Sequence, residues 1–424
     1  MRTCRAYAAL LLLTSFPFVR TSAAQDLRGG ELRINQATAG PQFGVDVAAL
    51  PNGDFVAVWL GGTTGRPGVE VRARRFFADG KAKGGDISVA RLPKPPTFGR
   101  APHVAADAAG RLLVVWDAPP TAPGGIDRVF GQRLDALGRK LGPVLRFKGL
   151  DRGQFGSDVA MAPDGRAVVV WEDWTGQVDG EGFGITNVYF QRLRANGAPA
   201  GPAVLAVSGG EASRVAVRAD GSFALATEIY GGEASFYDVF LSLYAADGAT
   251  LREPFEITTG DSETSSQIDP AIAAAADGRM FVAWTDRGAD SDVSDNDYFY
   301  DPIGIAGRLI DADGEPIGGN VAINTFEKGS QEIPSVAATP NGGFLVAWQT
   351  GANQDGDGTG IFARYLAADG RRLGGEIRMN LARQANQTQP VLALSPSGRG
   401  VAAWIGPDAD GSGLFGRRLA PPER

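Results

Sequence analysis

A unit of four short apolar runs recurs along most of this chain and constrains its fold more than any other feature. The clearest copy spans residues 331–380, and its runs read PSVAAT, GFLVAWQ, GIFARYLA and GEIRMN. Asn341-Gly342 separates the first two runs and Asp369-Gly370 the last two, which is typical of tight turns in antiparallel hairpins. A longer loop rich in Gly and Asp separates the middle two runs. The unit therefore predicts a four-stranded β-meander.

Seven copies align on the glycine of the first turn, here called the anchor glycine, at spacings of 57, 55, 56, 57, 64 and 56 residues. An alanine stands five residues before every anchor glycine. A tryptophan stands six residues after it in every copy except the fourth, which has Thr227. A repeat of this kind indicates an array of similar supersecondary units within one domain. The anchor glycines are Gly53, Gly110, Gly165, Gly221, Gly278, Gly342 and Gly398.

The run before the tryptophan is apolar at nearly every position, so this strand needs cover on both faces. Neighbouring blades of a β-propeller provide that cover. The last unit stops after its third run, whereas GGELRIN (residues 29–35) matches the fourth run of the sixth unit, GGEIRMN. We therefore predict an all-β fold, a seven-bladed β-propeller of four-stranded antiparallel blades in which the N-terminal strand completes the last blade. An open solenoid is the alternative, but it would not need this displaced strand.

Residues 1–24 have the pattern of a secretory signal peptide. Arg2 and Arg5 precede an apolar stretch over residues 6–18, and Ser22-Ala23-Ala24 forms a small-residue cleavage site. We expect export to the periplasm or the extracellular space, with residues 25–424 forming a single propeller domain. Cys4 is the only cysteine and would leave with this segment, so packing rather than disulfides must stabilise the domain.

Charge and hydropathy limit the partners. The chain has 41 basic and 48 acidic residues and a formal net charge of −7, and loss of residues 1–24 would remove three arginines and make it −10. An acidic surface repels phosphate backbones, which argues against nucleic acid as a partner. Outside residues 1–24, no stretch approaches the ~18 apolar residues of a membrane span. We expect a monomer that binds a carbohydrate or a protein.

The two ends of the predicted ring differ in their loops. Short turns such as PNG, PDG and ADG recur at one end, whereas the loops at the other end vary in length, and binding residues concentrate on such loops. Aromatic and acidic side chains gather there in units 3 to 5, which suits sugar rings that stack on aromatics and bond to carboxylates. The alternative is that these aromatics anchor their own loops. The candidate ligand-binding residues are Asp173, Trp174, Asp179, Tyr230, Tyr237, Asp295, Asp297, Tyr298 and Tyr300.

Alternating acidic residues in units 6 and 7 predict a calcium site, because several hard oxygens around one turn suit this cation. The run NQDGDG resembles the start of an EF-hand loop, but Arg364 stands where that motif needs its closing glutamate. Asp-Gly turns without any metal are the alternative, and the sequence predicts no other cofactor. The candidate calcium ligands are Asn353, Asp355, Asp357, Asp408 and Asp410.

Four charged or titratable residues stand seven positions before an anchor glycine, where the innermost strands would border the central channel: Asp46, His103, Asp158 and Arg214. His103 is the only histidine, which excludes a His-rich metal site. A Ser-His-Asp triad would depend on it, and no G-x-S-x-G run supports one. The alternatives are a structural histidine and a solvated ring of ion pairs.

The unit PSVAATPNGGFLVAWQTG…GIFARYLAADGRRLGGEIRMN resembles the Gly/Asp-rich tandem β-repeats of large secreted bacterial adhesin-like and RTX-type proteins. The resemblance covers nearly the whole chain after residue 24 and is weakest in unit 4, with Thr227 in place of tryptophan. It implies an exported bacterial protein with propeller-forming repeats, and it brings no catalytic residues with it.

These observations favour an exported propeller that binds a carbohydrate or protein on its long-loop face without catalysis. The alternative is a secreted carbohydrate-active hydrolase that uses paired Asp or Glu residues of the long loops, since glycosidases need only two suitably placed carboxylates. No spacing in the sequence singles out such a pair.

Overall fold

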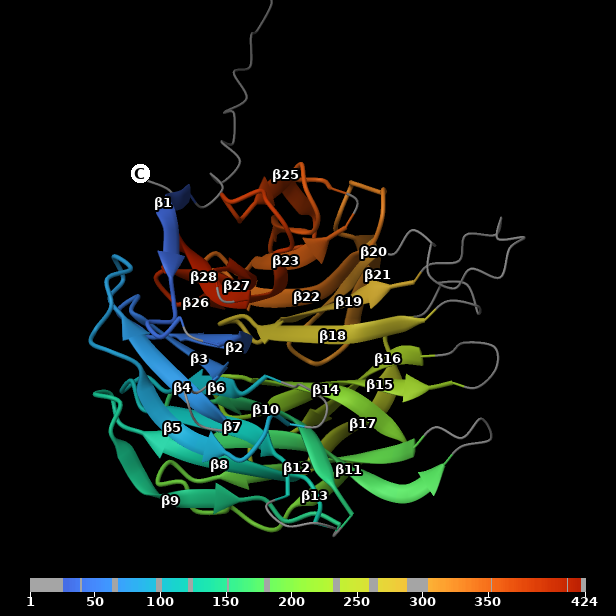
Figure 1. Cartoon of the computed structure of the whole chain (residues 1–424). Helices are drawn as coiled ribbons and strands as arrows, with labels where there is room; N and C mark the ends of the chain where they lie inside the picture. The colour runs from blue at the N-terminus through green and yellow to red at the C-terminus, as the bar shows by residue number, and fades with distance from the viewer. Residues whose placement is uncertain are drawn as a thin grey trace, which may run out of the picture.

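The structure, a computed structural model, shows a ring of seven four-stranded antiparallel sheets around a common axis (Figure 1). All regular elements in the described residues are β-strands. No helix long and apolar enough to span a membrane occurs in this part of the chain. The structure describes residues 26–38, 40–62, 68–96, 101–120, 125–150, 152–178, 184–231, 237–258, 266–287, 304–351, 353–409 and 411–420.

Blades 1 to 4 each consist of four consecutive strands, numbered outward from the axis. Their strands are β2 (Gln42–Ala49), β3 (Phe55–Gly62), β4 (Val69–Phe76) and β5 (Ile87–Leu92); β6 (His103–Ala106), β7 (Leu112–Ala118), β8 (Arg128–Leu134) and β9 (Lys140–Arg146); β10 (Gln154–Met161), β11 (Ala167–Val178), β12 (Gly184–Leu193) and β13 (Val204–Ser208); and β14 (Gly210–Val217), β15 (Phe223–Tyr230), β16 (Tyr237–Tyr244) and β17 (Thr250–Glu256).

Blades 5 and 6 repeat this order, whereas blade 7 takes its outermost strand from the N-terminal end of the described chain. The strands are β18 (Gln267–Ala274), β19 (Met280–Asp286), β20 (Gly304–Ile310) and β21 (Pro316–Ala322); β22 (Gln331–Ala338), β23 (Phe344–Thr350), β24 (Gly360–Leu366) and β25 (Arg372–Arg378); and β26 (Thr388–Leu394), β27 (Gly400–Asp408), β28 (Gly411–Ala420) and β1 (Asp26–Arg33).

Strand β1 closes the ring as predicted. It runs antiparallel to β28, with Leu32 opposite Gly416 and Arg33 opposite Phe415, and Figure 1 shows the two strands side by side. The predicted strand reached Asn35, but β1 ends at Arg33 because the Asn35 side chain takes over the pairing. Asn35 Oδ1 accepts a hydrogen bond from the Leu414 amide at 2.9 Å. This sheet therefore has no open edge beside β28.

The tryptophan position fills the space between blades, and blade 4 departs from the rule. In blade 1, Trp59 is fully buried and its Nε1 donates to Gln42 Oε1 at 2.9 Å. In blade 4, Thr227 replaces the tryptophan and Gly210 replaces the glutamine, and a Cβ on Gly210 would lie 2.7 Å from Thr227 Cγ2. The two smaller residues thus occur together and fit each other. Buried glutamines at the Gln42 position of other blades are Gln154, Gln267, Gln331 and Gln387.

The innermost strands border the channel, and each contacts the innermost strands of the adjacent blades, with β2 against β26 completing the ring. Residues ten positions before the anchor glycine are half-buried because solvent reaches them at the long-loop end, here called the mouth of the channel. Seven positions before the anchor the lining is polar except at Ala271 and Val391, and four positions before it the lining is apolar in every blade. The mouth residues in the described chain are Phe43, Phe155, Glu211, Ile268, Glu332 and Thr388.

Candidate functional site

A repeated hydrogen bond joins neighbouring blades at the mouth. The residue that directly follows the tryptophan position, here called the clasp residue, accepts a hydrogen bond from a backbone amide in a bulge of the next blade's innermost strand. In blades 2 to 6 the clasps are Asp117 to Gly156 (2.8 Å), Glu172 to Ala212 (2.9 Å), Glu228 to Asp269 (2.6 Å), Thr285 to Ile333 (3.1 Å) and Gln349 to Gln389 (3.1 Å).

The donors of these clasps have left-handed backbones, although only Gly156 is a glycine. The φ angle of Asp269 is 54°, and those of Ala212, Ile333 and Gln389 are 49°, 55° and 54°. A non-glycine residue in this conformation costs about 1–2 kcal/mol. The bulge therefore holds the side chain of Asp269 in a fixed direction at the mouth, at a position where glycine would be less strained.

The clasp between blades 4 and 5 brings two acidic residues together. Glu228 is 6 % exposed, and its Oε1 accepts the hydrogen bond from the Asp269 amide. Burial raises the pKa of Glu228 well above its usual range, and the nearby charges of Asp269, Glu211 and Glu172 raise it further. Glu228 therefore keeps its proton to a higher pH than an exposed glutamate does.

Two arginines give Asp269 a different environment. Burial also raises the pKa of Asp269, but Arg214 and Arg287 favour its charged form, while Glu332 opposes it. Thr285 Oγ1 lies 3.5 Å from Asp269 Oδ2. The pair thus combines a carboxyl group surrounded by negative charge with a carboxylate near two cations, the arrangement that separates an acid from a base.

Aromatic side chains lie on the same strand faces as the acidic clasp residues. Trp174 is two residues beyond Glu172 on β11, and Tyr230 is two residues beyond Glu228 on β15, so each points to the same side of its strand as the acid. Glu172 accepts a hydrogen bond from blade 4 and Glu228 accepts one from blade 5, so the Trp174 face points to blade 4 and the Tyr230 face points to blade 5. The structure thus places the predicted Trp174 and Tyr230 in equivalent positions at the rim of adjacent blades.

The other predicted ligand-binding residues divide into three groups. Tyr237 is opposite Tyr230, with ring centroids 5.5 Å apart, and both rings are half-buried. Asp173 is fully buried, and its Oδ2 accepts hydrogen bonds from the Leu150 amide (3.0 Å) and Trp171 Nε1 (3.2 Å). It braces blade 3 rather than facing the mouth, because alternate residues of β11 point to opposite sides. Outside the described residues lie Asp179, Asp295, Asp297, Tyr298 and Tyr300.

The predicted channel residues form an arc of alternating charge across blades 1 to 4. His103 Nδ1 lies 3.6 Å from Asp46 Oδ2 and 3.5 Å from Asp158 Oδ1. Burial lowers the pKa of His103, but the hydrogen bond to Asp46 and the charge of Asp158 outweigh it, so the pKa is raised. The two carboxylates also accept hydrogen bonds from the amides of Val104 (2.8 Å) and Val215 (2.9 Å) in the next blades. His103 therefore sits in an interblade network.

The predicted calcium ligands of blade 6 accept hydrogen bonds from their own loop and from the connection between β25 and β26. Asn353 Oδ1 accepts from the Gly358 amide (2.6 Å), Asp355 Oδ2 from Asn380 Nδ2 (2.7 Å), and Asp357 Oδ2 from the Ala385 amide (3.0 Å). Among the described residues, no three His, Cys, Asp or Glu side chains gather as a metal site. Calcium binding stays a prediction.

Asp408, predicted as a calcium ligand in blade 7, forms an ion pair with Arg33, and its Oδ1 accepts from the Ala409 amide at 2.8 Å. The arginine comes from β1, so this contact joins the closing strand to β27. Asp410 lies outside the described residues.

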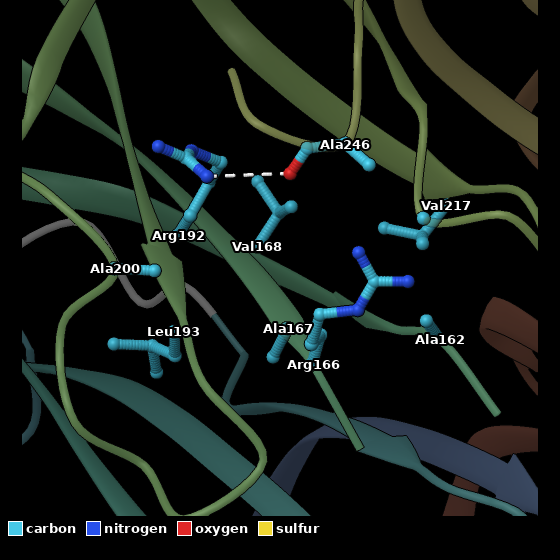
Figure 2. A pocket seen from close by; sticks show the side chains of 10 residues that line it. Ala162, Arg166, Ala167, Val168, Arg192, Leu193, Ala200, Val217 and Ala246 are labelled. Atoms are coloured by element: carbon cyan, nitrogen blue, oxygen red, sulfur yellow. Dashed lines mark hydrogen bonds between the residues drawn. The ribbon is translucent and has the colours of Figure 1, made fainter. Parts of the chain in front are cut away.

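Two hollows lie away from the mouth. A cavity of about 30 Å³ lies between blades 3 and 4 near their short turns (Figure 2), where Arg192 donates to the Ala246 carbonyl at 3.2 Å. Its volume suffices for about one water molecule. A cleft of about 460 Å³ lies beside β4 and β5 of blade 1, and its Arg72 is 3.2 Å from Glu70. Neither hollow combines paired acids with an exposed aromatic side chain.

Comparison with known proteins supports the fold but not a family. No protein-family model matches the chain, and no curated protein matches it. Similar solved structures include a Dyadobacter fermentans protein of unknown function (TM-score 0.55, 10 % identity, 93 % of this chain and 98 % of that one) and a Penicillium chrysogenum α-L-arabinanase complexed with arabinobiose (0.51, 11 %, 92 % and 99 %). A third is a polysaccharide lyase of family PL25, an ulvan lyase (0.53, 12 %, 94 % and 95 %). At these identities the similarity establishes the propeller fold alone.

Only part of what the resemblance to adhesin-like and RTX-type repeats implied is confirmed. The seven-bladed repeat architecture that the adhesin-like and RTX-type repeats implied is confirmed. The three similar structures named above are two carbohydrate-active enzymes and a protein of unknown function, whereas the adhesin-type family itself is not shown.

Proposed function

We propose that this protein is a glycoside hydrolase that acts on neutral sugar chains at the channel mouth, over blades 3 to 5. The observation that carries the proposal is the Glu228–Asp269 pair, a buried acid and a half-buried acid from adjacent blades in contrasting electrostatic environments. The sequence favoured a binding module without catalysis, but it did not reveal this pair. The geometry favours the hydrolase that the sequence left as an alternative.

The two acids have the properties that glycoside hydrolysis needs. Glu228, whose proton is retained to higher pH, donates it to the glycosidic oxygen as the bond to the anomeric carbon breaks. Asp269, kept near Arg214 and Arg287, stabilises the positive charge that develops on the sugar and takes a proton from the water that adds to the anomeric carbon. Trp174 and Tyr230 offer aromatic surface to the apolar faces of sugar rings.

The charge of the mouth favours neutral sugars over acidic ones. Around the Glu228–Asp269 pair as a whole, three further acids, Glu172, Glu211 and Glu332, outnumber the two arginines. A uronate or sulfate group would be repelled there, which argues against a lyase acting on acidic polysaccharide. An α-L-arabinanase with bound arabinobiose is among the similar propellers and supports a neutral substrate. The predicted signal segment supports export of the protein. An exported enzyme would meet polysaccharides that occur outside the cell.

The test is hydrolysis of a panel of neutral polysaccharides that includes linear arabinan, with ulvan as the acidic comparison and released reducing ends as the readout. We expect turnover of a neutral glycan, and a loss of at least about 10²-fold in kcat for Glu228→Gln and Asp269→Asn, because each removes a proton-transfer group. Both amides keep the volume of the acid, and Glu228→Gln keeps the oxygen that accepts the clasp.

Asp117→Asn is the matched control, because Asp117 occupies the same clasp position in blade 2 and bonds to Gly156. It should keep wild-type kcat. Turnover that survives in Glu228→Gln, or an unsaturated product from ulvan in place of hydrolysis, would overturn the proposal. Sugar binding with no turnover of any substrate would return the protein to the non-catalytic reading.

A further inference from the structure

Trp174 is exposed in a way that no other tryptophan of this chain is. The six tryptophans at the repeat position are at most 3 % exposed, whereas Trp174 is 41 % exposed. Aromatic side chains contribute most to stability when buried, so an exposed indole on a regular strand adds little to the fold. Leu150 (39 %) and Val178 (58 %) are also exposed on this part of blade 3.

The indole is held on a rigid support. Strand β11 has 12 residues, whereas its equivalents in the other blades have 7 to 9, so Trp174 stands at the base of an extension of the blade. The Trp174 amide donates to the Gly153 carbonyl at 3.0 Å, and Thr175 Oγ1 donates to the Ile185 carbonyl at 2.8 Å. These bonds fix both sides of the extension, which lowers the entropic cost of binding.

Gly184 on the paired strand sets the position of the ring. A Cβ at Gly184 would lie 2.9 Å from the indole Nε1 and 3.4 Å from Cδ1. A side chain there would push the indole away, whereas glycine lets it lie across β12. The Nε1 side of the ring thus lies close to Gly184, while the residue keeps two-fifths of its surface exposed.

The position of Trp174 relates it to the acid pair. Its strand face is that of Glu172, which bonds to blade 4, the blade that carries Glu228. Glu228 points to blade 5, so the sheet of blade 4 lies between the indole and the pair. Facing sheets are spaced about 10 Å apart, so a ligand on the indole lies at least one sheet spacing from the carboxyl groups of the pair. Glu172 on the same strand face and the acids around the pair disfavour an anionic ligand, and the exposed indole suits the stacking of a neutral sugar ring.

We infer that Trp174 is a stacking platform for a second sugar ring of the substrate, so that the site prefers a glycan chain over a monosaccharide glycoside. The inference rests on the proposed function and adds the substrate class. Trp174 binds a ring that is not cleaved, and it takes no part in proton transfer.

The experiment compares Trp174→Ala and Trp174→Phe with wild type on linear arabinan and on an aryl α-L-arabinofuranoside, which has a single sugar ring. For Trp174→Ala we expect KM on the polymer to rise about five- to tenfold, as the loss of one aromatic contact allows. On the aryl glycoside kcat/KM should stay unchanged, and Trp174→Phe should retain most of the polymer affinity. Gel mobility in the presence of arabinan gives a second readout that needs no turnover.

Phe77→Ala is the control, because Phe77 is 48 % exposed on a short turn at the opposite end of blade 1, and it should behave as wild type. Equal polymer KM and equal gel retardation for wild type and Trp174→Ala would overturn the inference, as would equal losses on both substrates. If wild type turns over no substrate, the proposed hydrolase fails. Loss of gel retardation in Trp174→Ala would then still support the platform. No retardation of wild type would overturn the platform as well.

Discussion

Glu228 and Asp117 occupy the same position in the repeat and make the same kind of backbone contact, yet their surroundings give them different chemistry. Asp117 accepts from the amides of Gly156 and Ser157 and from the Ser157 hydroxyl at 2.6 Å, so donors surround it. Glu228 accepts one amide and has three acids nearby. Acids near a carboxyl group favour its protonated form, as the neighbours of Glu228 do. The difference lies in the neighbours rather than in the repeat position.

His103 makes stability depend on pH at the residue scale. The groups that face it are Asp46 from β2, Asp158 from β10 and Arg214 from β14. Burial and the charge of Arg214 lower its pKa, but the two carboxylates outweigh them and raise it above 6.5. The contribution of its ion pairs is therefore complete below pH 6.5 and is lost as pH rises through the folded-state pKa. We expect the free energy of unfolding in urea to fall more between pH 6 and pH 9 in wild type than in His103→Gln. Parallel curves for the two proteins would contradict this.

At the scale of the elements, asparagine side chains continue the pairing of the third and outermost strands at the point where the backbone ladder between them ends. Asn35, Asn324 and Asn380 are in equivalent positions just beyond an outermost strand, and the Oδ1 of each accepts an amide of the third strand. The predicted strands ran into this asparagine because the letters of the repeat do not distinguish a paired residue from a capping one. Repeat letters alone thus placed the strands correctly but extended the closing strand by two residues.

The closing strand gives a test at this scale. Asn35→Ala leaves the buried Leu414 amide without its acceptor, which costs about 2 kcal/mol. We expect that loss in the free energy of unfolding measured in urea. Asn196→Ala, in an exposed turn where Asn196 Oδ1 accepts only the Ala198 amide, should change it by less than about 0.5 kcal/mol. Equal effects of the two substitutions would show that the Asn35 contact does not stabilise the closure.

At the scale of the whole molecule, the departures from the repeat gather on blades 3 to 5. There the long hairpin carries Trp174, Thr227 replaces the tryptophan, and Asp269 takes a left-handed position that is glycine in blades 1 and 3. The repeat predicted the ring, its closure by the N-terminal strand and the long-loop end as the place of a binding site. The one tryptophan outside the repeat pattern, Trp174, predicted one residue at the rim of that end. The acid pair was missed because it depends on a bulge that turns Asp269 toward Glu228. The absent tryptophan of unit 4 was the signal that marked this place.

The most direct test of the account is a crystal structure of Glu228→Gln with a bound arabino-oligosaccharide or another neutral oligosaccharide hydrolysed by wild type. The account predicts one sugar ring within hydrogen-bond distance of Asp269 at the channel mouth and an adjacent ring stacked on Trp174. Sugar bound at the short-turn end or in the cleft beside β4 and β5, with the mouth over blades 3 to 5 left free, would contradict it.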